Sequence, residues 1–261
     1  MKKIVSRDNK KIKELKKIGN KKYRNKFGKF LVENIAIIYD AIKSGYKPEA
    51  LFITQELLDK NSERVKFIIE NISDNNSFII LEKANRYFSS LDTSTGITVV
   101  YNKPKKQKIN LTKNILYLNG IKDPGNLGTI LRSAVAFGLD DVVLDKECVE
   151  VHNPKTIQSA KDSIFKINIT LDDEERTALK MAKSKMKILT TDVNGGIEVG
   201  DIFKTDDNFC VVMGSESHGV SEDVKIISDQ TINIKSSSKM ESLNVAVSTG
   251  IILYEMYNNN E

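Results

Sequence analysis

The sequence is poor in the residues that build disulfide frameworks and metal centres. Its 261 residues include only two cysteines, Cys148 and Cys210, and only two histidines, His152 and His218. The cysteines lack the spacing of metal ligands, so we expect reduced thiols, with a disulfide as the alternative. A histidine-rich metal site is not expected either, because the ligands are too few.

Long apolar runs are also missing. No stretch reaches the roughly 18 residues that are needed to span a bilayer. The first residues, MKKIVSRDNKKIKELKK, lack the apolar core of a signal peptide. Apolar residues make up 40% of the chain and charged residues 29%, which is typical of a globular protein. We therefore expect a cytoplasmic protein without a membrane partner.

Acidic residues are scarce at the N-terminus. Residues 1–30 hold thirteen Lys or Arg against two Asp or Glu, which is a net charge of +11. Because the whole chain has a net charge of +5, the other 231 residues carry −6. A basic N-terminal arm on a mildly acidic body predicts a polyanionic partner. The alternative is a solvated, partly frayed basic helix without a ligand.

The pattern of elements predicts two α/β domains with a linker between them. Residues 1–103 form a compact unit, in which Ile12, Leu15 and Ile18 indicate a short basic amphipathic helix. The basic segment 104–113, with its proline, reads as the linker. Further elements are expected as strands at 30–33, 50–54, 77–82 and 96–101 and helices at 34–44, 55–70 and from 83.

The second domain, residues 114–261, alternates strands and helices again. Strands are expected at 115–119, 141–145, 165–169, 187–191, 209–214 and 231–234, and helices at 127–137, from 154, at 173–183 and at 243–256. The strands ILYLN, DVVLD and FCVVMG are nearly continuous apolar runs. Such runs are typical of parallel strands buried on both faces, joined by right-handed crossovers.

The first motif, Asn119-Gly-Ile-Lys-Asp-Pro-Gly-Asn-Leu-Gly-Thr-Ile-Leu-Arg132, follows a buried strand and enters a helix. Asn126 is a good N-cap residue, and Arg132, 120° around the helix, can border the same pocket. Ligands bind at such strand ends in parallel sheets. The alternative is an ordinary turn with a solvent-facing arginine. Neither a dinucleotide nor a P-loop fingerprint is present.

The second motif is Met213-Gly-Ser-Glu-Ser-His-Gly219, which directly follows a buried strand. Two glycines in a short polar loop allow backbone to approach a ligand closely. Glu216 is a candidate for catalysis or for orienting a partner, and the alternative is a carboxylate that binds loop amides. His218 is interpreted as a loop residue, since nothing nearby would orient it as a base.

The third motif runs from Ile234 through a polar loop into Glu241-Ser-Leu-Asn-Val-Ala-Val. The helix that follows is apolar around most of its circumference, so it is expected to be buried or to form an interface. Ser242 is the natural N-cap of this helix. Its functional counterpart is a helix start that fixes a polar substrate.

Taken together, the three motifs resemble those of the SpoU (TrmH-like) branch of the SPOUT RNA ribose 2'-O-methyltransferases, in order and in spacing. The resemblance covers residues 115–257, and residues 27–33 and 50–54 resemble the substrate-binding domain that often precedes it. It implies an α/β fold with a mostly parallel sheet and a trefoil knot in the C-terminal domain, behind a small L30e-like α/β domain. It also implies a homodimer, RNA as the partner, with ribosomal RNA favoured over transfer RNA, and no metal.

The same resemblance implies the site. S-adenosyl-L-methionine would lie against backbone near its cofactor-binding residues, which are Gly214, Ile234, Leu243, Met213 and Asn244. The catalytic residues would be Arg132, Asn126, Glu216, Ser242 and Asn244. Because a guanidinium is almost never deprotonated, Arg132 is favoured as a stabiliser of the oxyanion and the phosphate, with a base as the alternative.

Two departures from the family pattern concern loop geometry. Lys235 replaces a frequent proline, and Ser159-Ala-Lys-Asp162 lacks a frequent glycine. The competing hypotheses are a non-catalytic SPOUT-fold protein that holds RNA, as in ribosome assembly, and a small-molecule α/β enzyme. The intact Arg132, Glu216 and Asn244 speak against the first, and the basic N-terminus and missing nucleotide fingerprints against the second.

Overall fold

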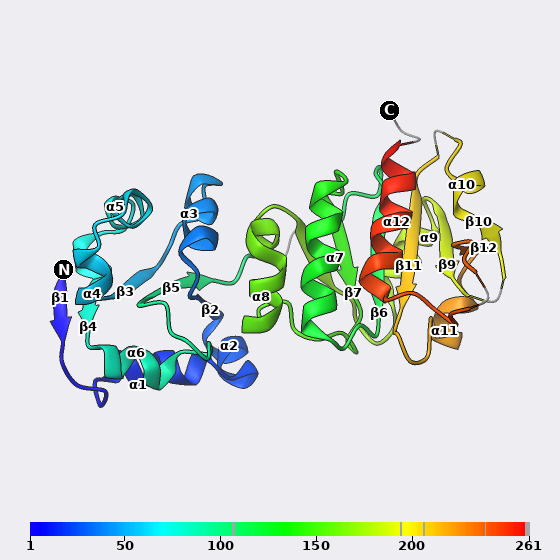
Figure 1. Cartoon of the computed structure of the whole chain (residues 1–261). Helices are drawn as coiled ribbons and strands as arrows, with labels where there is room; N and C mark the ends of the chain where they lie inside the picture. Colours follow the sequence, from blue (N-terminus) through cyan, green and yellow to red (C-terminus); the bar gives the residue numbers. More distant parts are fainter. Residues whose placement is uncertain (106–107, 194, 206, 238, 259–261) are drawn as a thin grey trace. The chain divides into compact units, whose positions relative to one another are not determined.

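The computed structural model describes residues 1–105, 108–193, 195–205, 207–237 and 239–258 (Figure 1). The chain forms two compact units, Met1–Lys105 with His152–Gln158, and Lys106–Val151 with Ser159–Glu261. Residues 106–107 of the predicted linker lie outside the described residues. Within the described ranges, no helix has the length and apolar character that crossing a membrane requires.

The first unit is a mixed sheet with helices on its faces. Its strands lie in the order β1-β4-β3-β5-β2, with β5 antiparallel to β3 and β2, and the other pairs parallel. The strands are β1 (Lys2–Ile4), β2 (Lys29–Val32), β3 (Ala50–Thr54), β4 (Ser77–Ile80) and β5 (Ile97–Asn102). The helices are α1 (Lys10–Ile18), α2 (Lys21–Phe27), α3 (Ile35–Lys43), α4 (Gln55–Asp59), α5 (Glu63–Glu70), η1 (Asp74–Asn76) and α6 (Glu82–Phe88).

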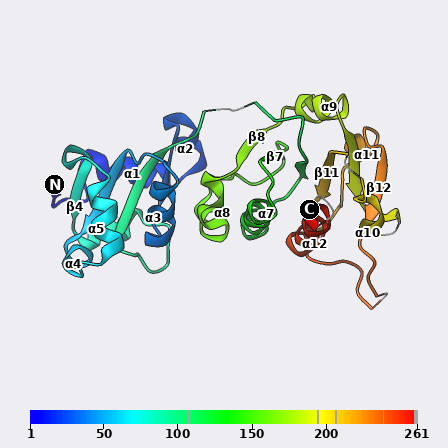
Figure 2. The ribbon, with the colours of Figure 1, turned by 90° about the horizontal axis from the view of Figure 1, so that it is seen from above.

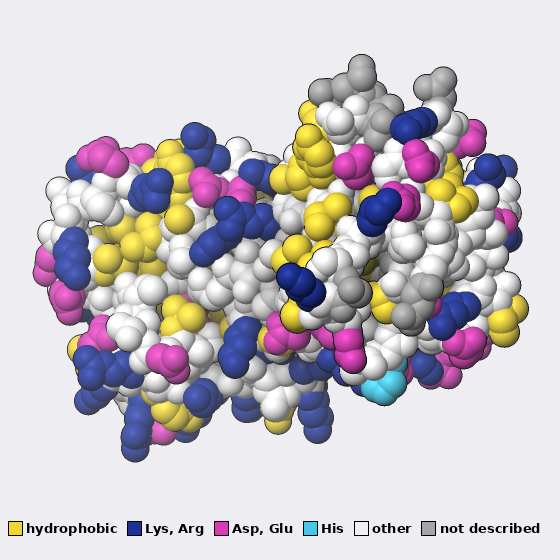
Figure 3. Space-filling model, turned by 45° about the vertical axis from the view of Figure 1, so that its right-hand side comes forward, with side chains coloured by type: hydrophobic (Ala, Val, Ile, Leu, Met, Phe, Trp, Pro, Cys, Tyr) yellow, Lys and Arg dark blue, Asp and Glu magenta, His cyan; other side chains and the backbone are white. Residues whose placement is uncertain are grey.

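The basic N-terminal segment is part of this unit and not an arm. Ile12, Leu15 and Ile18 of α1 are buried in one core cluster with residues of the sheet and of α6. The lysines of α1 and α2 therefore lie on the outer faces of packed helices, because the apolar positions point inward. Figure 3 shows Lys and Arg side chains along the lower rim of this unit, where Figure 1 places α1 and α2.

The helix predicted over 55–70 is two helices, α4 and α5. Asn61 between them has a φ of +51°, in the left-handed region, which ends α4. Thr54 caps α4, with Oγ1 accepting a hydrogen bond from the Leu57 N–H. Apolar residues continue at helical spacing across the break, so the periodicity does not reveal it.

The second unit is built on a parallel sheet, which confirms the predicted fold class. Its described strands lie in the order β10-β12-β9-β11-β6-β7-β8, and every pair is parallel. They are β6 (Ile115–Asn119), β7 (Asp141–Leu144), β8 (Asn168–Leu171), β9 (Lys187–Thr191), β10 (Ile197–Glu198), β11 (Phe209–Gly214) and β12 (Gln230–Asn233). The helices are α7 (Pro124–Ala136), η2 (Lys161–Phe165), α9 (Thr177–Lys183), α10 (Val199–Ile202), α11 (Glu222–Lys225) and α12 (Val245–Asn258), and most of α8 (Pro154–Ala160) belongs to the first unit.

Helices cover both faces of this sheet, as the continuous apolar strands predict. Figure 2 shows α7 and α12 on one side and α9 on the other. On the α9 side, Tyr117 and Val212 pack with Leu179 of α9 and Val224 of α11 in one core cluster.

The predicted starts of β8 and α9 are wrong. Residues 161–165 form the turn η2, so β8 starts at Asn168 and not at Phe165. Helix α9 starts at Thr177 and not at 173, because Asp172 and Asp173 use their carboxylates to accept backbone N–H groups of its first turn. Local side-chain bonds of this kind compete with the helix and delay its start.

Candidate active site

The three motifs meet at one edge of the parallel sheet. Strands β6, β11 and β12 end at Asn119, Gly214 and Asn233, and each is followed by one motif loop. Gly214 is the direct register partner of Asn119. Because all strands are parallel, these ends share the edge at which ligands bind in such sheets.

Asn126 does not cap α7, contrary to the prediction. The N-cap is Asp123, whose carboxylate accepts a hydrogen bond from the Asn126 N–H at 2.7 Å, and Pro124 occupies the first helical position. Proline is favoured there because its missing N–H would have no helical partner. The cap three residues earlier leaves the side-chain amide of Asn126 available for other contacts.

That amide contacts the other two motifs. Asn126 Nδ2 donates a hydrogen bond to Glu216 Oε1, and Asn126 Oδ1 accepts one from Asn244 Nδ2 at 3.1 Å. The structure thus joins three of the predicted site residues, which are far apart in sequence, in one hydrogen-bonded chain.

Ser242 does not cap α12, again contrary to the prediction. The helix starts at Val245, and its cap is Asn244, whose Oδ1 accepts hydrogen bonds from Ala246 N at 2.9 Å and Val247 N at 3.4 Å. Ser242 lies exposed in the preceding loop. Its side chain forms no hydrogen bond with the part of the chain that is described.

Arg132 lies on the exposed surface of α7, six residues after Asn126. It makes no hydrogen bond and no ion pair with other described residues, so the structure does not bring it into the Asn126–Glu216–Asn244 chain. A guanidinium with five unused donors at this position is available to a phosphate or an oxyanion.

Gly214 is required by the packing of the Glu216 loop. A Cβ on Gly214 would lie 2.1 Å from the carbonyl carbon of Gly219 and 2.2 Å from the Val220 nitrogen. Ser215 and Gly219 exchange two backbone hydrogen bonds, of 3.0 and 2.9 Å, and Gly219 has a φ of +65°. The loop is thus a tight turn that only glycine at both positions allows.

The expected cofactor-binding residues line the same edge. Gly214 ends β11, Ile234 directly follows β12, and Leu243 is 39% exposed just before α12. Asn233 Oδ1, at the end of β12, is a buried oxygen without a hydrogen-bond donor among the described residues. An apolar side chain, loop backbone and an unsatisfied acceptor fit a nucleoside with an amino group and hydroxyls. The side chain of Met213 is buried, so only its backbone belongs to this edge.

Sequence reasoning missed a polar cluster that supports these loops. Asn119 donates to Asp145 at 2.7 Å and accepts from the Ser221 N–H at 2.7 Å. Arg176 contacts Asp145, Ser221 and Asp223. The sequence did contain a signal for this cluster, because Asn119 and Asp145 are polar residues at the ends of otherwise apolar strands.

Two pKa shifts reflect this cluster. Burial raises the pKa of the Tyr117 hydroxyl well above its ordinary value, and the neighbouring Asp172 carboxylate adds to the shift. The pKa of Asp223 lies below its ordinary value because Arg176 donates a hydrogen bond to it. At neutral pH the cluster therefore contains a neutral Tyr117 beside the charged pair of Arg176 and Asp223.

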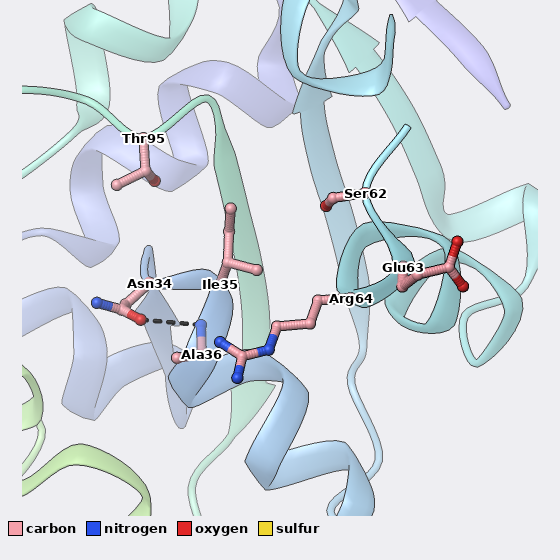
Figure 4. A pocket seen from close by; sticks show the side chains of 7 residues that line it. All are labelled: Asn34, Ile35, Ala36, Ser62, Glu63, Arg64 and Thr95. Atoms are coloured by element: carbon pink, nitrogen blue, oxygen red, sulfur yellow. Dashed lines mark hydrogen bonds between the residues drawn. The ribbon is translucent and has the colours of Figure 1, made fainter. Parts of the chain in front are cut away.

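A separate cavity of about 550 Å³ lies in the first unit (Figure 4). It is lined by Asn34, Ile35, Ala36, Ser62, Glu63, Arg64 and Thr95. Arg64 is exposed and lies over the ring of Tyr39, at 5.5 Å. None of the predicted catalytic residues lines this cavity. Among the described residues, no cluster of three or more His, Cys, Asp or Glu is arranged to hold a metal ion, and both cysteines are free and buried.

Comparison with protein families gives two matches. The profile of the SpoU rRNA Methylase family matches residues 113–254, and that of the MRM3-like substrate binding domain matches residues 9–98. The 23S rRNA (guanosine(2553)-2'-O)-methyltransferase RlmP of Bacillus subtilis is 30% identical over 256 residues, which cover 98% of this chain and 99% of that protein. The mitochondrial rRNA methyltransferase 3A of Danio rerio is 26% identical over 293 residues, and the match covers 89% of this chain and 64% of that protein.

Solved structures show the same fold at lower identity. An AdoMet-bound rRNA methyltransferase from Sinorhizobium meliloti has a TM-score of 0.83 and 21% identity, covering 98% of this chain and 97% of that one. The SpoU methyltransferase AviRb from Streptomyces viridochromogenes, in complex with AdoMet, has a TM-score of 0.85 and 20% identity, covering 96% and 97%.

Proposed function

The chain belongs to the SpoU rRNA methylase family, and we propose on that basis that it transfers a methyl group from S-adenosylmethionine to a ribose 2'-hydroxyl of ribosomal RNA. The observation that carries the proposal is the double hydrogen bonding of Asn126, to Glu216 and to Asn244. It assembles the three motifs at the edge of the sheet where ligands bind.

The proposal divides the work between two parts of the chain. Residues 114–261 form the methyltransferase domain, residues 1–103 an L30e-like RNA-binding domain, and 104–113 the linker. The match of residues 9–98 to a substrate-binding domain supports this division.

Gly214, Ile234 and Leu243, with Met213 and Asn244 beside them, would hold S-adenosylmethionine. When bound, the cofactor supplies an electrophilic methyl group on a sulfonium. The backbone around Gly214 is fixed by the Ser215–Gly219 turn, so this surface is formed before any ligand arrives.

The direction of the hydrogen bonds makes Glu216 an acceptor. Asn244 uses Oδ1 to cap α12, so its Nδ2 must donate to Asn126 Oδ1. Asn126 Nδ2 is then left to donate to Glu216 Oε1. The second oxygen of Glu216 has no partner in the described chain, and we assign it to hold the ribose or Arg132.

Arg132 is proposed as the catalytic residue. The 2'-hydroxyl oxygen would have to be held facing the methyl group that the cofactor would supply, so positioning of the ribose is the main task. The hydroxyl is a poor acid, and its oxygen develops negative charge as its proton passes to solvent water. The unpaired guanidinium of Arg132 stabilises that charge and an adjacent phosphate. Ser242, exposed in the third motif, would contact the ribose.

The basic outer faces of α1 and α2 are proposed to bind RNA phosphates. Lys16 and Lys17 lie over the rings of Tyr87 and Tyr23, at 5.4 and 5.8 Å. Charged groups interleaved with aromatic rings suit RNA, because phosphates are bound by the charges and unpaired bases stack on the rings.

The assembly is proposed to be a homodimer in the cytoplasm, with a trefoil knot in the methyltransferase domain. Support for the dimer comes from α12, which exposes 53% of Val247, 50% of Tyr254 and 41% of Tyr257. Apolar side chains in a row on one helix are typical of a covered interface.

The test is methyl transfer by the purified protein to ribosomal RNA from a strain that lacks the gene. We expect label from S-adenosylmethionine at one ribose of 23S rRNA, and the guanosine named for the Bacillus subtilis relative is the first position to map. Binding of that RNA without any methyl transfer would contradict the proposal and support a non-catalytic RNA-binding protein. Binding of S-adenosylmethionine, measured by calorimetry, distinguishes the two directly.

A further inference from the structure

The guanidinium of Arg176 sits at the centre of a polar cluster in the methyltransferase domain. Its side chain is 14% exposed. Nε donates to Asp223 Oδ2 at 2.5 Å, Nη1 to the Tyr117 hydroxyl at 3.0 Å, and Nη2 to Ser221 Oγ at 3.4 Å. Nη1 also lies 3.5 Å from the buried Asp145. One side chain thus connects two strands, β6 and the end of β7, with the segment 221–223.

This segment is the far end of the Glu216 loop. Val220 is buried, and the next residue, Ser221, is bound twice, by its N–H to Asn119 Oδ1 and by its hydroxyl to Arg176. The near end of the loop is Gly214, which is paired with Asn119 in the sheet. The loop is therefore held at both ends, and Arg176 supplies the charged contacts at the far end.

The first motif loop starts from the same cluster. Asp145 Oδ2 accepts from Asn119 Nδ2, and Asp145 Oδ1 accepts from the Gly120 N–H at 3.1 Å. Asp145 is buried, and the only cation that the described residues place within ion-pair distance of it is Arg176. A buried carboxylate needs such compensation, so the geometry of both loops depends on this guanidinium.

The backbone of Arg176 is in the left-handed region, with a φ of +56°. Side chains other than glycine rarely adopt it, so the surrounding contacts hold the residue there. A left-handed backbone at Arg176 costs conformational free energy, so the contacts of its side chain must stabilise the fold or the site.

We propose that Arg176 is a positioning residue for methyl transfer, which sets the position of the Glu216 loop by clamping Ser221 and Asp223. The inference rests on the proposed function only for its catalytic consequence, because the clamp itself is a property of the fold. Arg176 touches none of the residues assigned to the ribose or the cofactor, so its effect passes through the loop.

The matched control is Lys183→Gln. Lys183 is the last residue of α9, the helix that follows Arg176, and pairs with Asp229, which precedes β12 and so lies at the opposite edge of the sheet. Each variant removes one cation, but Arg176→Gln removes the contacts with Asp145 and Asp223 and acts on the Glu216 loop, whereas Lys183→Gln removes only the pair with Asp229.

The experiment compares both variants with the wild type by hydrogen exchange and by kinetics. In Arg176→Gln we expect exchange of the Ser215 and Gly219 amides to accelerate about tenfold or more, since charge-assisted hydrogen bonds are lost. We expect kcat to fall about tenfold or more, with the KM for RNA unchanged, because the basic surface that is proposed to bind RNA, on α1 and α2, is not altered. Lys183→Gln leaves both quantities at the wild-type value.

Unchanged exchange and unchanged kcat in Arg176→Gln overturn the proposal, as does an equal loss in Lys183→Gln. If Arg176→Gln does not fold, Asp223→Asn removes the ion pair with Arg176 at its exposed partner. Exchange and kcat of that variant are then measured in the same way. A wild type without methyl transfer refutes the proposed function alone, because the exchange measurement still decides whether Arg176 holds the loop.

Discussion

Asn244 donates a hydrogen bond from Nδ2 to Asn126 Oδ1 at 3.1 Å, while its own Oδ1 caps α12. The two ends of one amide thus perform different tasks. The acceptor end stabilises a helix, and the donor end orients Asn126 toward Glu216. Because the tasks use different atoms, substitution can separate them.

Asn244→Asp keeps the cap and removes the donor. Asp and Asn are about equally good N-caps, so the free energy of unfolding is expected to change by less than about 0.5 kcal/mol. The new carboxylate faces Asn126 Oδ1 without a proton to donate, so we expect kcat to fall about 100-fold. Thermal denaturation and single-turnover kinetics measure the two effects.

Asn153→Asp is the matched control, because Asn153 Oδ1 accepts from the Lys155 N–H at the start of α8 and belongs to none of the three motifs. It is expected to leave kcat unchanged. Full activity in Asn244→Asp would show that the bond to Asn126 has no role in catalysis.

Arg132→Ala tests the catalytic assignment. Arg132 has no partner in the described structure, so the variant is expected to fold and to bind S-adenosylmethionine normally. Loss of an oxyanion stabiliser is expected to lower kcat about 10²- to 10³-fold. Normal binding together with a wild-type rate would refute the role of Arg132, and Arg132→Lys tests whether a point charge suffices.

Glu216→Gln removes a charge but keeps a side-chain oxygen that can accept from Asn126. We expect the fold and the melting temperature to be retained, and kcat to fall about tenfold to 100-fold because the ribose or Arg132 loses an anionic partner. Glu222→Gln, on exposed α11, is the control with an equal change of charge. Equal values of kcat in both variants would show that Glu216 has no part in catalysis and only binds the loop.

Gly214→Ala is expected to displace the Glu216 loop, because the new Cβ would overlap Gly219 and Val220 backbone. We expect a loss of about 1–3 kcal/mol in the free energy of unfolding and weaker binding of S-adenosylmethionine. Gly200→Ala, where a Cβ meets open space, is expected to change stability by no more than about 1 kcal/mol. If Gly214→Ala binds S-adenosylmethionine with normal affinity in calorimetry, the described geometry of the loop is contradicted.

RNA affinity is expected to depend steeply on salt through the N-terminal unit. A variant in which three exposed lysines of α1 and α2 become glutamine, Lys10, Lys17 and Lys21, is expected to lower the slope of log affinity against log salt by about 2. The slope is measured by filter binding between 50 and 200 mM salt, a range in which counterion release dominates.

The same triple change in the second unit, at Lys180, Lys187 and Lys204, provides the charge-matched control. A smaller decrease in slope is expected there, because these lysines lie outside the basic N-terminal segment. Equal decreases would show that the basic N-terminal surface has no special part in binding RNA.

Much of the fold was predictable because apolar periodicity decides it. Strands β6, β7 and β11 lie where their nearly continuous apolar runs indicated, since a strand buried on both faces has few alternatives. Helix starts were less predictable, because a cap is chosen among several polar residues that are close together in sequence. Asp123 with Pro124 took precedence over Asn126, and Asn244 over Ser242.

The sequence by itself determined the parallel sheet, the order of the motifs and the residue types of the site. Only the tertiary structure decided that Asn126 would bridge Glu216 and Asn244 and that Arg176 would contact Ser221 at the end of the Glu216 loop. The physical reason is that periodicity is local, whereas these contacts join residues between 45 and 118 positions apart. Parallel strands bring such residues to one edge, and the hydrogen-bonding needs of the helix caps then fix which atoms donate and which accept.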